Sequence, residues 1–125
     1  MSIQEFYFAI GGDYDAIRGR FGSDERIEKF VNMFFMDKSY ENLLASLNDG
    51  DLATAFRCAH TIKGNAKNVS FQALVKSSTE LTEALRLDDE GVSAAPEKIP
   101  ELLESVRSDM DVVFAARREH LIAGE

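Results

Sequence analysis

The sequence predicts an all-α fold, an antiparallel up-and-down four-helix bundle with a short additional N-terminal helical segment. Three observations lead to this prediction. Proline occurs only 2 times in 125 residues, the β-branched residues are scattered instead of alternating with polar ones, and the apolar residues recur at helical spacing. The connections between the predicted helices are short, which favours antiparallel neighbours.

The N-terminal segment, residues 1–22, is predicted to be a helical brace. Ser2 and Glu5 have the spacing of a capping box at the start of a short helix, and the glycine pair that follows is expected to end that helix. A second short turn is expected to begin at residue 13, to continue through residue 17 and to end near residues 19–22. The segment is interpreted as an attachment to one domain, not as a domain of its own.

Residues 23–125 are predicted to form the bundle. Ser23 has the residue type of an N-cap before an acidic first turn. The apolar spacing then predicts one helix over roughly 24–47, with a break at 37–39 as the alternative. A tight connection should follow, in which Gly50 takes the left-handed conformation and Asp51 caps the next helix.

The remaining helices follow from the same spacing. A stripe of apolar and small residues predicts the second helix from Leu52 to about Val69, and a third pattern begins at Phe71 and ends at Leu85. Residues 87–95 are expected to form a polar loop. The last helix should begin near one of the two prolines, at positions 96 and 100, because proline is tolerated at a helix start.

Composition limits the classes of partner. The chain has 14 Lys and Arg against 22 Asp and Glu, a net charge of -8, which repels phosphate backbones and anionic lipid headgroups. We therefore expect no nucleic-acid and no membrane partner. The single cysteine, Cys58, fits a reducing compartment, and no apolar run approaches the roughly 18 residues of a spanning helix. A cytoplasmic protein without a cofactor is expected.

One flank of the second predicted helix has the composition of a reactive site. On an ideal helix His60 points about 120° away from the centre of the apolar stripe. Lys67 lies about 20° from His60 around the helix, and Lys63 lies about 60° from His60. Gly64 lies one turn beyond His60, where glycine costs about 1 kcal/mol of helix stability relative to alanine. Bare backbone beside the imidazole would explain that glycine, because it leaves room for a second protein.

An imidazole with lysines beside it is suited to phosphoryl transfer. The neutral ring nitrogen is nucleophilic near physiological pH, and the transfer requires mainly alignment and charge stabilisation. On residue types alone, however, a helix histidine with nearby lysines is more often a solvated polar flank.

The run from Ala59 to Gly64, AHTIKG, followed by Val69 and Phe71, resembles the signature of histidine phosphotransfer (HPt) domains. The resemblance implies a four-helix bundle whose His60 accepts a phosphoryl group from a receiver-domain aspartate, or from a kinase, and donates it to another receiver. It implies a phosphocarrier of a two-component phosphorelay, without kinase activity of its own. The implied partners are a response-regulator receiver domain and a sensor histidine kinase.

The resemblance also implies roles for residues near His60. Lys63 would stabilise the phosphate, with Lys67 beside it, and Gly64 would give access. Members of the family often have Gln or Glu on the adjacent helix to orient the imidazole. Ungapped counting places Thr82 there, with Thr79 and Glu83 nearby.

The sequence departs from the family pattern at two positions. Ser70 stands where the family usually has glycine, and Asn65 stands where it usually has a small Ser or Ala. The departure at Ser70 motivates an alternative function, a non-phosphorylated helical scaffold that binds a receiver domain. A metal-binding bundle ranks last, because the sequence has no Glu-x-x-His motif, and no metal ligand is predicted.

Other residues have simpler interpretations. Lys67 could equally be surface charge, and His120 is expected to complement the C-terminus of the last helix. Phe34, Phe35 and Phe56 are interpreted as core residues, although one of them could form an apolar rim around His60.

Overall fold

The computed structural model describes residues 2–122, and over this range the chain is helical without a β-strand. An isolated antiparallel bridge joins Leu87 and Ser93 in the loop before the last helix. The all-helical prediction is therefore confirmed. None of the described helices combines the length and apolar character needed to cross a membrane.

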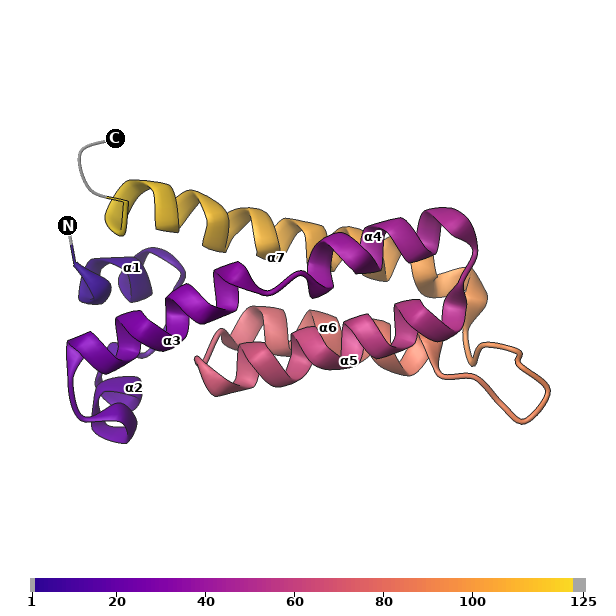
Figure 1. Ribbon diagram of the computed structural model, residues 1–125, viewed down its shortest axis with the longest axis horizontal. Coiled ribbons are helices and arrows are strands. Elements are labelled where there is room, and N and C mark those ends of the chain that lie inside the picture. Colours follow the sequence, from indigo (N-terminus) through magenta and orange to yellow (C-terminus); the bar gives the residue numbers. More distant parts are fainter. Residues whose placement is uncertain (1, 123–125) are drawn as a thin grey trace.

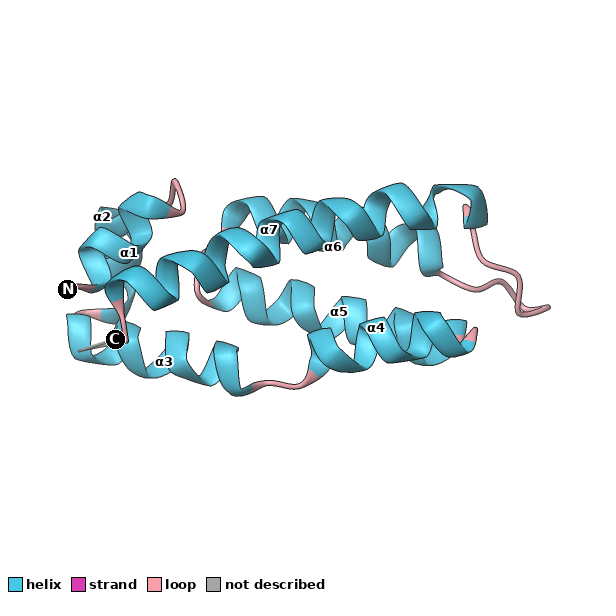
Figure 2. Ribbon diagram, turned by 90° about the horizontal axis from the view of Figure 1, so that it is seen from above, coloured by secondary structure: helices cyan, strands magenta, loops and turns pink. Residues whose placement is uncertain are grey.

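The helices in chain order are α1 (Ile3–Ala9), α2 (Tyr14–Phe21), α3 (Asp24–Met36), α4 (Ser39–Asp49), α5 (Leu52–Asn68), α6 (Gln72–Leu85), the 3-10 turn η1 (Pro96–Lys98) and α7 (Ile99–His120). Figure 1 shows α3 and α4 following each other almost in line, with α5, α6 and α7 beside them and α1 and α2 at one end. In the view of Figure 2, α6 and α7 lie on one side and α3, α4 and α5 on the other. Helix α5 packs against both α4 and α6.

The hydrophobic core continues from the bundle into α1. Phe6 and Tyr7 of α1 are fully buried, and the Phe6 ring lies 5.7 Å from that of Phe71 and 6.3 Å from that of Phe35. Such spacings between ring centroids are favourable for aromatic pairs. The hydroxyl of Tyr7 also donates a 2.6 Å hydrogen bond to the carbonyl of Val69, just after α5. The N-terminal segment thus contributes to the same core as the long helices.

The N-terminal helices begin where their capping residues predict, but α2 is longer than expected. The Ser2 hydroxyl accepts from the backbone N–H of Glu5 at 3.0 Å, and Asp13 caps α2 through the N–H of Ala16 at 3.1 Å. The expected turn over residues 13–17 is instead part of an eight-residue helix. It continues through Gly19, because a single glycine lowers helix stability without blocking the helix, and it ends at Gly22 with φ 88°.

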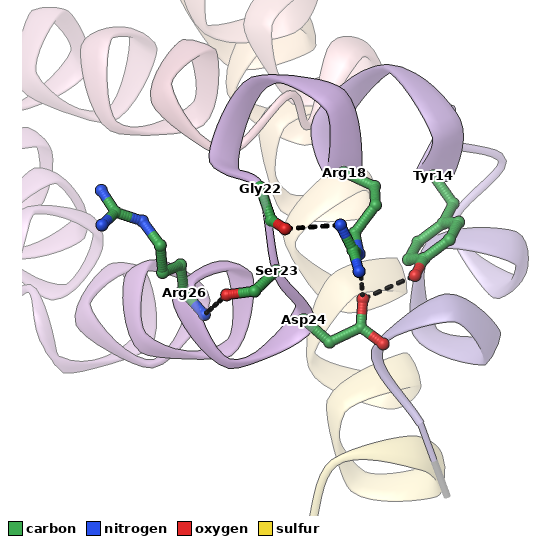
Figure 3. Close-up of polar contacts among 6 residues, drawn as sticks. All are labelled: Tyr14, Arg18, Gly22, Ser23, Asp24 and Arg26. Carbon is green, nitrogen blue, oxygen red and sulfur yellow. Dashed lines mark hydrogen bonds and ion pairs between the residues drawn. The ribbon is translucent and has the colours of Figure 1, made fainter.

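Polar contacts fix the corner between α2 and α3, as Figure 3 shows. Arg18 donates to the Gly22 carbonyl at 2.5 Å and lies 3.2 Å from the Asp24 carboxylate, which also accepts from the Tyr14 hydroxyl at 2.5 Å. Ser23 caps α3 by accepting from the Arg26 N–H at 3.3 Å, as predicted. Charged and capping groups therefore hold this corner at the surface.

The predicted helix over 24–47 is two helices, so the alternative with a break is correct. Helix α3 ends at Met36, Asp37 is extended with ψ 141°, and α4 begins at Ser39. The Asp37 carboxylate accepts from the Ser39 N–H at 2.8 Å and so stabilises the break. At its other end α4 runs to Asp49, and Gly50 has φ 76° as predicted.

The segment between α6 and α7 also agrees with the prediction. Residues 87–95 form a loop, in which the Asp88 carboxylate accepts from the N–H groups of Glu90 and Val92 at 2.9 Å each. Pro96 opens the 3-10 turn and Pro100 lies in the first turn of α7, where neither removes a hydrogen bond that the helix needs.

Candidate functional site

Helix α5 is held along one face and open along another. Asp51 caps it through the Thr54 N–H at 3.1 Å, as predicted. The buried residues are mostly small, which lets the neighbouring helices approach closely. They are Ala55, Ala59, Ile62 and Ala66. The face that remains outside this stripe contains the candidate residues.

His60 lies in the middle of α5 and is exposed to solvent. Its ring stacks with that of Phe56, one turn earlier, with 6.2 Å between centroids and an angle of 20° between the ring planes. Within residues 2–122 no hydrogen bond is made to either ring nitrogen of His60. The contact with Phe56 uses the face of the ring, and both nitrogens lie at its edge.

Gly64 is exposed beside His60. A Cβ built on this residue would meet no heavy atom within 4 Å, so no neighbour in the described chain requires a glycine here. Glycine inside a helix costs about 1 kcal/mol relative to alanine.

The two lysines differ in their surroundings. Lys63 is half-buried, and its charge acts on the carboxylate of Glu83 in α6. Lys67 is exposed in the last turn of α5, where a positive charge also complements the helix dipole. Both extend positive charge along the helix that presents His60.

Glu83 and Arg86, at the C-terminal end of α6, form a paired contact next to this flank. Arg86 donates to Glu83 through Nε at 3.2 Å and through Nη2 at 2.9 Å. The hydrogen bond from Arg86 is the main cause that holds the pKa of the Glu83 carboxyl below its usual range, and the charges of Arg86, Lys63 and His60 lower it further. Glu83 is therefore ionised and close enough to His60 to act on its charge.

The two threonines proposed with Glu83 are used inside α6. Thr82 is fully buried and its hydroxyl donates to the Ser78 carbonyl at 2.6 Å. Thr79 is half-buried and donates to the Val75 carbonyl at 2.6 Å. Of the three candidates on the adjacent helix, Glu83 is the one whose side chain lies in the electrostatic environment of His60.

Phe56 lies against His60, and Arg86 lies over Phe56. The sequence named Phe56 only as one of three candidates for an apolar rim, and it did not indicate Arg86. The Arg86 guanidinium lies over the Phe56 ring, 5.0 Å from its centroid, within the range of a cation–π contact. Phe56 was interpreted as core with a rim around His60 as the alternative, and the structure places it half-buried against His60. An i, i+4 spacing from His60 was the available indication for Phe56.

The end of α5 keeps a regular geometry despite Ser70. Ser70 has φ 58°, in the left-handed region. The Phe71 N–H donates to the Ala66 carbonyl at 2.9 Å, and the Ser70 N–H to that of Lys67 at 3.2 Å, which is the hydrogen-bond pattern of a Schellman motif. Ser70 thus takes the left-handed conformation for which glycine is usual at this position, and the turn keeps both of its hydrogen bonds.

Comparison with protein families agrees with this geometry. The Hpt domain family matches residues 32–112, which include all of α5 and α6. The chain belongs to the Hpt domain family. No match was found among curated proteins or solved structures.

Membership confirms the resemblance inferred from residues 59–71. Hpt domains are phosphocarriers of two-component signalling and interact with receiver domains and kinases, without being kinases themselves. The match to the Hpt domain covers His60, Gly64 and Glu83, whereas α1 and α2 lie outside it.

Proposed function

We propose that this Hpt domain is a phosphorelay carrier in which His60 accepts a phosphoryl group from a receiver-domain aspartate and donates it to another receiver. The observation that supports it most is the exposed imidazole of His60 beside Gly64, where an added Cβ would meet nothing within 4 Å. This open space leaves room for a partner to bring an aspartyl phosphate to the edge of the ring.

The proposed transfer is a displacement at phosphorus. The lone pair of an unprotonated ring nitrogen of His60 forms the N–P bond, while the bond between phosphorus and the aspartate oxygen breaks and its electron pair leaves with the carboxylate. The ring becomes positively charged until its other nitrogen releases a proton to solvent. Donation to a second receiver is the same step reversed. A sensor histidine kinase is the alternative source of the phosphoryl group.

Charges near His60 support this chemistry. Lys63 and Lys67 are proposed to stabilise the phosphoryl oxygens, because the charge that is spread over them must be offset during transfer. The ionised Glu83 is proposed to stabilise the positive ring and to favour its orientation. Gly64 is proposed to give access. The Hpt domain itself then needs only to align the ring and to balance charge.

The helices are proposed to serve this site in two ways. We propose that α3 with α4, α5, α6 and α7 act as the four helices of an antiparallel up-and-down bundle, residues 23–125. Residues 1–22 are proposed to act as a brace at one end. The single cysteine, Cys58, is a free thiol, which supports a cytoplasmic location, and the net charge of -8 favours protein partners over nucleic acid or membranes.

Labelling from a phosphorylated receiver tests the proposal. The wild-type chain is expected to take up phosphate that is labile in acid and stable in alkali, and His60→Gln is expected to take up none. His120→Gln, which changes the other histidine of the chain, is the matched control and should label like wild type.

Binding measurements separate the carrier from a scaffold. Binding of the receiver by the wild-type chain without any labelling across a panel of receivers would contradict the carrier and support the scaffold. Equal labelling of wild type and His60→Gln would contradict the role of His60.

A further inference from the structure

We propose that Phe56 is a positioning residue for phosphoryl transfer, because its ring holds the imidazole of His60 by stacking, and that Arg86 supports Phe56 in this role. The inference rests on the proposed function of His60 and adds to it the means by which the ring is oriented. No hydrogen bond from residues 2–122 performs this task, as described above.

Stacking suits a nucleophilic imidazole better than a hydrogen bond would. The Phe56 and His60 rings are 20° from parallel, with centroids 6.2 Å apart, within the range in which aromatic pairs attract. The contact uses the face of the imidazole and leaves both nitrogens at its edge unoccupied. The ring is thus restrained while the attacking lone pair and the N–H stay free.

Phe56 is itself restrained, which makes it a useful support. Its ring is half-buried and packs against the hydrophobic core. Arg86 lies 5.0 Å from its centroid, and Arg86 is held by the two hydrogen bonds that it donates to Glu83 at the end of α6. The exposed His60 ring is therefore linked through Phe56 to groups on a second helix, whose positions do not depend on His60.

The expected effect on rate is modest. Transfer requires the ring nitrogen, the phosphorus and the leaving oxygen to be in line, and a ring that rotates freely reaches this arrangement less often. The typical strength of an aromatic pair corresponds to a change of about two- to tenfold in rate. Loss of the stack should therefore slow transfer without abolishing it.

The experiment compares substitutions that keep or remove the ring. Phe56→Leu keeps an apolar side chain and removes the stack, whereas Phe56→Tyr keeps the ring. Phe21→Leu is the matched control, because Phe21 is also half-buried, with Arg20 at 5.0 Å from its centroid and Phe30 beside it at 4.9 Å. Two quantities are measured: the transfer rate at saturating phosphorylated receiver, and the NMR shifts of the His60 ring protons.

The proposal expects both quantities to respond together. Phe56→Leu should lower the saturated transfer rate about two- to tenfold and remove the ring-current shift of the His60 protons. Phe56→Tyr should retain both, and Phe21→Leu should leave both unchanged. The ring-current shift reports whether the stack is present in solution, and the saturated transfer rate reports whether the stack contributes to transfer.

Three outcomes would overturn the proposal. The first is a wild-type saturated rate in Phe56→Leu. The second is a loss of receiver affinity alone, which would make Phe56 a docking residue. The third is the absence of a ring-current shift in the wild-type chain. A wild-type chain that takes up no phosphate from any receiver would instead contradict the proposed function of His60.

Discussion

The C-terminal end of α5 and the flank that presents His60 are built in opposite ways. At the end, the N-terminal helices reach the last carbonyls of the helix: Tyr7 donates to Val69 at 2.6 Å and Arg20 donates to Asn68. On the flank, His60 and Gly64 face solvent. The difference suggests that stability and reactivity are separated along one helix, with a fixed end supporting an open site.

Removal of the Tyr7 hydroxyl should give the largest loss of stability without loss of function. Tyr7→Phe leaves the Val69 carbonyl without its hydrogen bond in a buried position, and an unsatisfied buried group costs about 1–3 kcal/mol. Urea unfolding measures the change. Tyr14→Phe, which removes an exposed hydrogen bond to Asp24, is the control and should change stability less.

The phosphotransfer rate of the same variant tests whether the C-terminal end of α5 affects the reactivity of His60. Tyr7→Phe should transfer phosphate at the wild-type rate under conditions where it is folded. A slower rate in the folded variant would mean that the end of α5 influences the site.

The same substitution should alter the alkaline side of the stability profile. Burial raises the pKa of the Tyr7 phenol, so the folded chain keeps its proton at pH values where the unfolded chain loses it. Stability should fall as the pH rises above about 10, the ordinary value for tyrosine. Tyr7→Phe should show a shallower fall in unfolding experiments between neutral and alkaline pH. An unchanged slope would contradict the contribution of this phenol.

Gly64→Ala should raise stability and lower transfer. Alanine favours a helix by about 1 kcal/mol over glycine, and the added Cβ would come within 4 Å of no packing neighbour among the described residues. Gly19→Ala is the control, since Gly19 lies inside α2 and also has open space around it. Both variants should unfold at higher urea concentration, and only Gly64→Ala should take up phosphate more slowly. Wild-type transfer in Gly64→Ala would show that bare backbone is not needed there.

Ser70→Gly should have the smallest effect. The left-handed conformation costs a residue with a side chain about 1–2 kcal/mol, but glycine loses more backbone entropy on folding, about 0.5–1 kcal/mol. A net stabilisation of about 0.5 kcal/mol is therefore expected in thermal unfolding. A loss of stability would show that the Ser70 side chain contributes more than its conformation costs.

Much of the fold could be predicted from the sequence because capping residues mark helix starts directly. Ser23 and Asp51 begin helices where predicted. The break after Met36 was less certain, since apolar spacing continues across it and the decisive contact is one local hydrogen bond that the Ser39 N–H donates to the Asp37 carboxylate. The segment after residue 13 ends within the predicted range 19–22, but it was expected to be a short turn and is an eight-residue helix.

The site could be predicted in part for a similar reason. The exposure of His60 and Gly64 follows from the angles within one helix. The contact of Arg86 with Phe56 depends on how α6 lies against α5, and periodicity within one helix does not report that register. For the same reason, counting along the sequence put Thr82 opposite His60, whereas Thr82 is buried and Glu83 is the residue whose charge acts there.

Phe6 and Tyr7 lie outside the residues that match the family but inside the hydrophobic core. The family match begins at residue 32, yet both side chains are completely buried in a core shared with Phe71. A fragment trimmed to the matched residues would expose the face of Phe71 that Phe6 and Tyr7 cover. It would also leave the carbonyls of Asn68 and Val69 without the donors Arg20 and Tyr7. We therefore expect the smallest piece of this protein that folds on its own to include residues outside the family match.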